Sequence, residues 1–144
     1  MNIPTDITIQ TWVRLIRAQH SALSYVEKAL KEQKLPPLCW YDILLELERV
    51  DQEGIRPFEL EYRLLLPQYS VSRLIERIEK KGYLLRDVCE GDKRGQCLII
   101  TKAGKELRKK MWPVYSQAIH QAIGEKLTTA ESRALSKHLF KLIE

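Results

Sequence analysis

The amino-acid sequence predicts a mainly α-helical fold with one small β-hairpin, organised as a single domain over residues 1–144. Apolar residues recur at helical spacing over most of the chain. Two β-rich runs, residues 83–89 and 96–101, flank a short turn that contains Gly91 and Gly95, which is typical of a hairpin. Hydrophobic residues make up 44% of the 144 residues, so one core can form without a metal or disulfide framework.

The first predicted helix covers residues 6–34 and ends at Leu35-Pro36-Pro37, because proline cannot continue a helix. At 1.5 Å per residue it is roughly 40 Å long, which is more than a small domain can cover. We therefore expect part of it to pack on another surface, such as a second subunit. Its apolar positions are Ile9, Trp12, Leu15, Ile16, Leu23, Val26 and Leu30.

Two shorter helices are predicted next. The first covers residues 38–50, with Ile43, Leu44, Leu47 and Val50 as its buried stripe. After a loop at residues 51–54, Pro57 fits the first turn of a third helix, where its missing N–H costs little. The apolar positions of this third helix are Phe58, Leu60, Leu64 and Leu65.

A fourth amphipathic helix follows Leu66-Pro67 and ends at Gly82, a residue suited to the position after a helix. Its inward positions are Val71, Leu74, Ile75 and Ile78. The side chains left facing away are polar or basic: Gln68, Tyr69, Ser70, Ser72, Arg73, Arg77 and Lys80.

The last third of the sequence is predicted to form two helices. One covers residues 102–125 and contains Pro113, which should bend it. Thr128 and Glu131 have the spacing of a capping box that opens the final helix. We expect the buried side of that helix to hold Leu135, Leu139, Leu142 and Ile143.

The excess of positive charge is concentrated around the fourth helix and the hairpin. Residues 66–110 hold 12 Lys and Arg against 6 Asp and Glu, whereas the whole chain has 24 against 19. Such a basic region favours a polyanionic partner, although a solvated basic face would have the same composition. The sequence contains neither a run long enough to span a membrane nor a signal peptide, so we expect a cytoplasmic protein.

A helix followed directly by a hairpin with a cationic tip is the arrangement of a winged helix, with double-stranded DNA as the leading partner. Arg73 and Arg77 suit phosphate or guanine contacts, and Arg94 at the hairpin tip suits a narrow minor groove. Asp92 is expected to pair with Arg94 and hold it outward. Completing the predicted DNA-binding set are Lys93, on adjacent phosphates, and Gln68, Tyr69, Ser70 and Ser72, near base edges.

The segments SVSRLIERIEKKGYLLR and DKRGQCLIITKAGKEL, in this order of elements, resemble the MarR family of bacterial transcription regulators. The resemblance covers essentially the full length and implies a winged helix-turn-helix at about residues 35–101, flanked by dimerisation helices at 1–34 and 102–144. It also implies a homodimer on a palindromic operator, acting as a repressor released by a small anionic or phenolic effector. The chain departs from the family pattern at Leu65-Leu66-Pro67, where a small residue is usual, and at Arg56, which replaces a Thr or Ser cap.

The resemblance places the effector in a crevice lined by the first, second and fifth helices. Aromatic residues at helical spacing are also common in an ordinary core, so that alternative stays open. The candidate effector-binding residues are Trp12, Arg17, His20, Trp40, Tyr41 and Tyr115.

Other classes of function lack sequence support. His20, His120 and His138 have no partner at ligand spacing, so we predict no metal and no cofactor. No motif of an enzyme active site is present, and a winged helix that binds protein or RNA is the closer alternative.

The three cysteines Cys39, Cys89 and Cys97 are expected to be reduced in the cytoplasm. Cys89 and Cys97 are nearly symmetric about Lys93 and could face each other across the hairpin, where we expect a bond between them to distort the wing.

Overall fold

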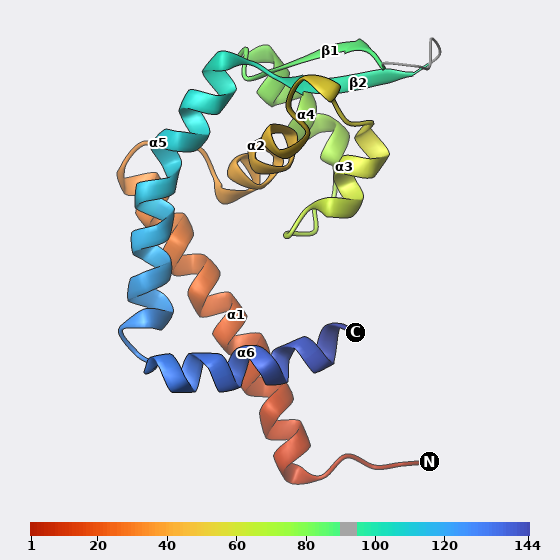
Figure 1. Cartoon of the computed structure of the whole chain (residues 1–144). Coiled ribbons are helices and arrows are strands. Elements are labelled where there is room, and N and C mark those ends of the chain that lie inside the picture. The colour runs from red at the N-terminus through yellow and green to blue at the C-terminus, as the bar shows by residue number, and fades with distance from the viewer. Residues whose placement is uncertain (90–94) are drawn as a thin grey trace. The chain divides into compact units, whose positions relative to one another are not determined.

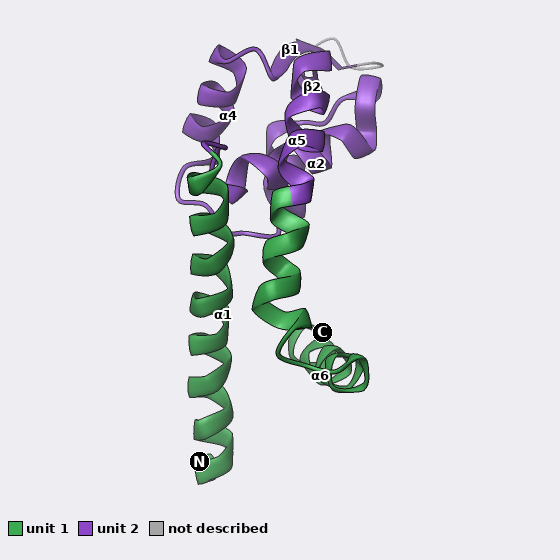
Figure 2. Ribbon diagram, turned by 90° about the vertical axis from the view of Figure 1, so that its left-hand side faces the viewer, with its two compact units in different colours: residues 1–33, 114–144 green, residues 34–113 purple. Residues whose placement is uncertain are grey.

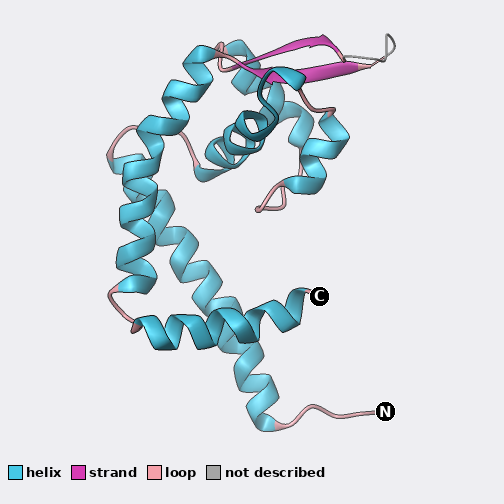
Figure 3. Ribbon diagram, in the orientation of Figure 1, coloured by secondary structure: helices cyan, strands magenta, loops and turns pink. Residues whose placement is uncertain are grey.

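The structure, a computed structural model, describes residues 1–89 and 95–144. The described elements are predominantly helical and include a single two-stranded antiparallel sheet, which confirms the predicted fold class (Figure 1, Figure 3). In chain order they are α1 (Asp6–Glu32), α2 (Leu38–Val50), a 3₁₀ turn (Asp51–Glu53), α3 (Pro57–Arg63), α4 (Val71–Lys80), β1 (Leu84–Val88), β2 (Gln96–Ile100), α5 (Lys102–Ile119), a π-helical turn (His120–Gly124) and α6 (Thr129–Ile143).

The chain divides into two compact units, coloured separately in Figure 2. The winged-helix unit, residues 34–113, holds α2 to β2 and the first part of α5. The terminal-helix unit, residues 1–33 and 114–144, holds α1, the end of α5 and α6. The division falls after Pro113, which lies inside α5 as predicted.

The winged-helix unit has a closely packed apolar core. Ile43, Leu44 and Leu47 of α2 are fully buried, and Ile78 of α4 and Leu98 of β2 join them. The sheet pairs Leu84 with Ile100 through Val88 with Gln96, and Ile55 forms an isolated bridge to Leu98 on the other edge of β2. This bridge ties the segment before α3 to the hairpin.

One threonine and two glycines connect α4, the hairpin and α5. Gly82, with φ +82°, closes α4: its N–H donates to the carbonyl of Glu79, and the N–H of Tyr83 donates to that of Ile78, the hydrogen bonds of a Schellman motif. The Thr101 hydroxyl donates to the Gly82 carbonyl over 2.6 Å and accepts from the Gly104 N–H over 3.1 Å. A Cβ at Gly104 would collide with the Tyr83 carbonyl, so glycine is required there.

In the terminal-helix unit, α1 and α6 are capped at their N-termini, but few side chains are buried. Thr5 caps α1 by accepting from the Thr8 N–H, and the predicted capping box of Thr128 and Glu131 is confirmed at the start of α6. The expected buried side of α6 is wrong, because this helix has no buried residue and Ile143 is 79% exposed. Its apolar side chains lack a covering surface within the described chain.

Some helix bounds and some buried positions differ from the sequence-based prediction. The fourth helix begins at Val71, so residues 68–70 precede it, and α1 ends at Glu32. In α3, Leu60 is buried but Phe58 is 65% and Leu65 72% exposed, because the helix is only two turns long and presents one residue to the core. The residues predicted for the fifth helix continue from α5 into the π-helical turn.

Candidate nucleic-acid interface

α4 separates apolar and polar side chains by face. Val71, Leu74, Ile75 and Ile78 are the buried residues of this helix, as predicted. Ser72, Arg73 and Arg77 are exposed, and neither arginine forms an ion pair with the described part of the chain. The two guanidinium groups, one helical turn apart, therefore keep their donors for an outside acceptor.

The residues before α4 extend this polar surface. Ser70 is the N-cap residue of α4 but makes no side-chain capping bond, so its hydroxyl remains available. Tyr69 is fully exposed and Gln68 is half-buried. The predicted wing residues Asp92, Lys93 and Arg94 lie outside the described residues.

The other charged residues of α4 are already paired. Glu79 accepts from Arg86 of β1 over 3.1 Å, which links α4 to the hairpin. Lys80 lies 3.8 Å from Glu76, so this lysine contributes less free charge than its exposure suggests. Arg73 and Arg77 are the strongest candidates on α4 for contact with a polyanion.

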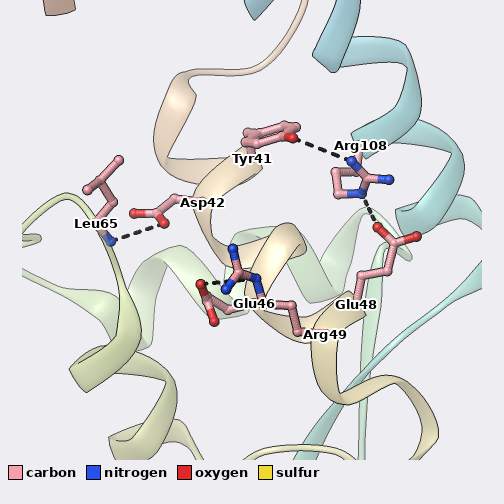
Figure 4. A network of polar contacts seen from close by, with 7 residues as sticks. All are labelled: Tyr41, Asp42, Glu46, Glu48, Arg49, Leu65 and Arg108. Carbon is pink, nitrogen blue, oxygen red and sulfur yellow. Dashed lines mark hydrogen bonds and ion pairs between the residues drawn. The ribbon is translucent and has the colours of Figure 1, made fainter. Parts of the chain in front are cut away.

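Asp42 fixes the turn that precedes α4, a role that the sequence analysis missed. This α2 residue is 7% exposed, and its two carboxylate oxygens accept from the backbone N–H groups of Leu65 and Leu66 over 3.1 and 2.9 Å. Figure 4 shows the first of these bonds. The turn that departs from the family pattern is thus held by a side chain from another helix. The available signal was an acidic residue beside the buried stripe of α2, one turn before Glu46.

α2 and α5 meet around a second polar cluster. Arg108 forms an ion pair with Glu48 and donates to the Tyr41 hydroxyl over 3.4 Å (Figure 4). The Tyr41 ring stacks on Trp112 with centroids 6.1 Å apart. Sequence reasoning missed Arg108 and Trp112, since they lie sixty or more residues from their partners.

The candidate effector residues fall in two groups. Trp40 and Tyr41 belong to the winged-helix unit, where Trp40 packs edge-on against Tyr83 at 6.1 Å and Tyr41 is 5% exposed. The group in the terminal-helix unit comprises Trp12, Arg17 and His20, all exposed on α1, and Tyr115, half-buried on α5.

Cys89 and Cys97 are joined by a disulfide, so the expectation that both are reduced is wrong. Their Cα atoms lie 5.0 Å apart, and the β1–β2 register remains regular up to Val88 and Gln96. The expected distortion is therefore absent from the described part of the hairpin. Cys89 continues the strand pairing opposite Gly95, so it lies diagonally across from Cys97, with the Val88–Gln96 pair between them. Cys39 takes no part in this disulfide.

Two further searches cover the described residues. No helix among them is both long and apolar enough to cross a bilayer. They also include no cluster of His, Cys, Asp or Glu that could hold a metal ion.

Comparison with known proteins gives consistent matches. A sequence model described as MarR family matches residues 33–95. The transcriptional repressor MprA of Escherichia coli strain K12 is 27% identical over 125 residues, which span 87% of this chain and 70% of MprA.

Two solved structures cover nearly all of the chain. The first is Sco3205, a MarR family transcriptional regulator from Streptomyces coelicolor in complex with DNA, with a TM-score of 0.88 and 25% identity over 100% of this chain and 90% of that one. The second is Bordetella bronchiseptica BpsR, whose DNA binding is regulated by 6-hydroxynicotinic acid, with a TM-score of 0.83 and 22% identity over 99% of both chains. At that lower identity the likeness to BpsR concerns the fold alone.

Proposed function

This chain belongs to the MarR family of winged-helix transcription regulators, and from that premise we propose that it acts as a homodimeric repressor on a palindromic DNA operator. One observation carries the proposal: α4 buries its apolar stripe, while Arg73 and Arg77 stay exposed and form no ion pair with the described residues. Two such helices related by a two-fold axis would contact half-sites about one helical turn, roughly 10 bp, apart.

Each proposed contact has a chemical role. Arg73 suits bidentate recognition of guanine, and Arg77 a phosphate contact, while the hydroxyls of Ser70 and Ser72 suit base edges or phosphates. Gln68 and Tyr69 extend this reach at the start of α4. On the wing, Arg94 would enter the minor groove, Lys93 would contact phosphates and Asp92 would orient Arg94.

The terminal-helix unit supports the homodimer. On α1, Ile7, Trp12 and Ile16 are at least 43% exposed, and on α6, Phe140 is 59% exposed. An apolar groove of about 460 Å³ lies between α1 and α6, lined by Leu15, Ala22, Leu127, Leu135, Leu139 and neighbouring residues. Apolar surface of this extent is typical of a subunit interface.

Replacing Phe140 with glutamate tests the dimer. A charge on this exposed apolar position should prevent association without damaging the winged-helix core, since burying an unpaired carboxylate at an interface is costly. We expect a monomer by sedimentation velocity at micromolar concentration and at least about a hundredfold weaker operator binding, because half of the phosphate and base contacts are lost. Lys137→Glu on the same helix is the matched control and should stay dimeric. A wild-type protein that is monomeric would contradict the proposal.

Selection of tight binders from a random duplex pool tests sequence-specific DNA binding. We expect a palindrome to be enriched, with affinity that falls steeply as salt rises. Arg94→Ala should weaken binding to most sequences and reduce the salt slope, whereas Arg73→Ala should cost about 1–3 kcal/mol and relax base preference at one position. Equal binding of single strands, or no enriched sequence, would indicate a protein or RNA partner instead.

We further propose that a small anionic or phenolic molecule releases the operator. The precedent in BpsR, whose DNA binding a hydroxylated aromatic acid regulates, suggests this chemistry. Arg17 or His20 of the terminal-helix unit would meet the carboxylate, and Trp12 and Tyr115 of the same unit would pack on the ring. Titrating hydroxylated aromatic acids into the operator complex tests this, and Arg17→Ala should weaken the response.

A further inference from the structure

The hairpin carries a covalent crosslink that operator recognition does not require. Cys89 follows β1 directly and Cys97 lies within β2, and the two residues are 7% and 5% exposed. The Cys89 N–H donates to the Gly95 carbonyl over 3.0 Å, so strand pairing continues one residue beyond β1. The disulfide therefore closes the base of the wing, next to the ladder that attaches the wing to the core.

A cavity of about 300 Å³ gives small molecules access to this bond. It is lined by Cys89 and Cys97 together with Glu53, Gly54, Ile55, Arg56 and Glu59. The sulfur-bearing residues are thus largely covered, yet they form part of the wall of an open pocket. A pocket of this size suits a small thiol better than a protein surface.

Arg56 adds a positive charge to the same pocket, which also holds the carboxylates of Glu53 and Glu59. Its Nη1 atom lies 2.9 Å from the point where a Cβ on Gly95 would be, so the guanidinium packs against the backbone at the base of the wing. A nearby cation stabilises a thiolate relative to a thiol, and the thiolate is both the nucleophile and the leaving group in thiol–disulfide exchange.

We propose that Cys89 and Cys97 form a thiol–disulfide modification site whose co-reactant is a low-molecular-weight thiol and its disulfide. In the reducing direction, a thiolate attacks one of the two sulfurs, forms a mixed disulfide and releases the other cysteine as a thiolate. A second thiol then resolves the mixed disulfide. In total, two small thiols become one small disulfide and give their two protons to Cys89 and Cys97, and oxidation is the reverse.

The consequence for DNA binding rests on the proposed function of the hairpin as a DNA-contacting wing. Closing the bond fixes Cys89 to Cys97 at the base of the hairpin, so this base has less conformational freedom to lose on DNA. Reduction should leave the fold intact, because the β1–β2 ladder and the Ile55–Leu98 bridge do not depend on the sulfurs. The oxidised protein should bind DNA about fivefold more tightly.

The chemical step is tested without DNA. The full-length protein is equilibrated in defined mixtures of reduced and oxidised glutathione, its free thiols are alkylated, and each cysteine is quantified by mass spectrometry. Cys89 and Cys97 should lose their reactivity toward the alkylating agent together, in one two-electron transition. Cys39 should still be alkylated at the glutathione ratios at which the Cys89–Cys97 disulfide forms. Independent alkylation of Cys89 and Cys97 at every ratio would overturn the proposed site.

The effect on binding is tested by fluorescence anisotropy with the selected operator and a random duplex of equal length. The fivefold difference between oxidised and reduced protein should vanish in Cys89→Ser/Cys97→Ser and persist in the matched control Cys39→Ser. A disulfide that forms without changing operator affinity would overturn the regulatory consequence. Equal binding of operator and random duplex in both redox forms would instead contradict the proposed function, and the alkylation result would still decide whether the site exists.

Discussion

The two units of this chain bury similar apolar residues to very different extents. In the winged-helix unit, Ile43, Leu44 and Leu47 are completely buried. In the terminal-helix unit, α6 has an equally regular apolar spacing and a complete capping box, yet none of its residues is buried. An amphipathic pattern therefore predicts that a helix has a face to be covered, but it does not say which chain will cover it.

This difference follows from the neighbours that each helix has along the chain. α4 contacts β1 and buries four residues within the winged-helix unit, where α2, α3 and the hairpin all lie within residues 38–100. α6 has α1 and the π-helical turn beside it, and the groove between them remains open. A second copy of the chain would supply the missing surface, which is why the winged-helix unit should depend on its own core and the terminal-helix unit on association.

The largest expected contrast comes from the same substitution in the two units. Ile78→Ala removes a side chain that is 0% exposed and should lower the free energy of unfolding by about 2–5 kcal/mol. Ile143→Ala, at 79% exposure, should change the unfolding of a single chain by less than about 0.5 kcal/mol. Urea denaturation followed by circular dichroism measures both.

Repeating both measurements at several protein concentrations separates the stability of the single chain from the contribution of association. The cost of Ile78→Ala should be the same at every concentration, whereas that of Ile143→Ala should grow as chains associate, because association contributes to apparent stability. A large cost of Ile143→Ala that does not depend on concentration would mean that its own chain covers α6.

The sequence predicted local features of the winged-helix unit well. The bounds of α2, the four buried residues of α4 and the closing role of Gly82 all follow from spacing and backbone preference. Each depends on residues within one or two helical turns, where periodicity and capping chemistry act.

Features that depend on distant partners could not be predicted in the same way. Asp42 meets backbone groups 23 and 24 residues later, and its place beside the buried stripe of α2 does not tell which groups it contacts. The symmetry of Cys89 and Cys97 about the turn indicates that they could pair, but a reducing compartment favours free thiols, so the sequence does not predict the disulfide. The exposed Phe58 shows that an apolar residue in a short helix need not reach the core.

A smaller effect should separate specific from non-specific DNA binding in the winged-helix unit. Asp42→Asn replaces one acceptor with a donor that faces a backbone N–H, so it should lower the free energy of unfolding by about 1–3 kcal/mol. It should also weaken operator binding more than binding to random duplex, because the turn before α4 is no longer fixed. Anisotropy with the two duplexes measures this ratio.

Glu46→Gln is the matched control, since Glu46 lies on the same helix, is 9% exposed and contacts Arg49 rather than the turn. It should leave the ratio of operator to random affinity unchanged. In the amide ¹H–¹⁵N spectrum, the Leu65 and Leu66 signals should move in Asp42→Asn alone. Equal changes in both variants would mean that any buried carboxylate of α2 has this effect.

The smallest expected effect concerns one surface carboxyl in each unit. The hydrogen bond from Lys105, whose Nζ lies 2.8 Å from the carboxylate, followed by that from Gln52, lowers the pKa of Asp51. In the terminal-helix unit, the backbone N–H of Thr128 and then its hydroxyl lower the pKa of Glu131. A carboxyl group whose pKa is lower in the folded than in the unfolded state stabilises the folded state at pH values above its unfolded pKa, which is about 4. This contribution to stability is lost as pH falls through the folded pKa.

Asp51→Asn and Glu131→Gln should therefore each flatten the acid side of the stability profile and converge with the wild type at the lowest pH. Asparagine tolerates the positive φ of +49° at position 51, and glutamine can still accept the bond from Thr128, so each substitution removes mainly the charge. Urea denaturation from pH 2 to pH 7 measures both profiles. If the winged-helix unit unfolds independently of the terminal helices, Asp51→Asn should change the free energy of unfolding equally at all protein concentrations. Glu131→Gln should change it most at concentrations where the chains are associated, because α6 is then held in place by the second chain.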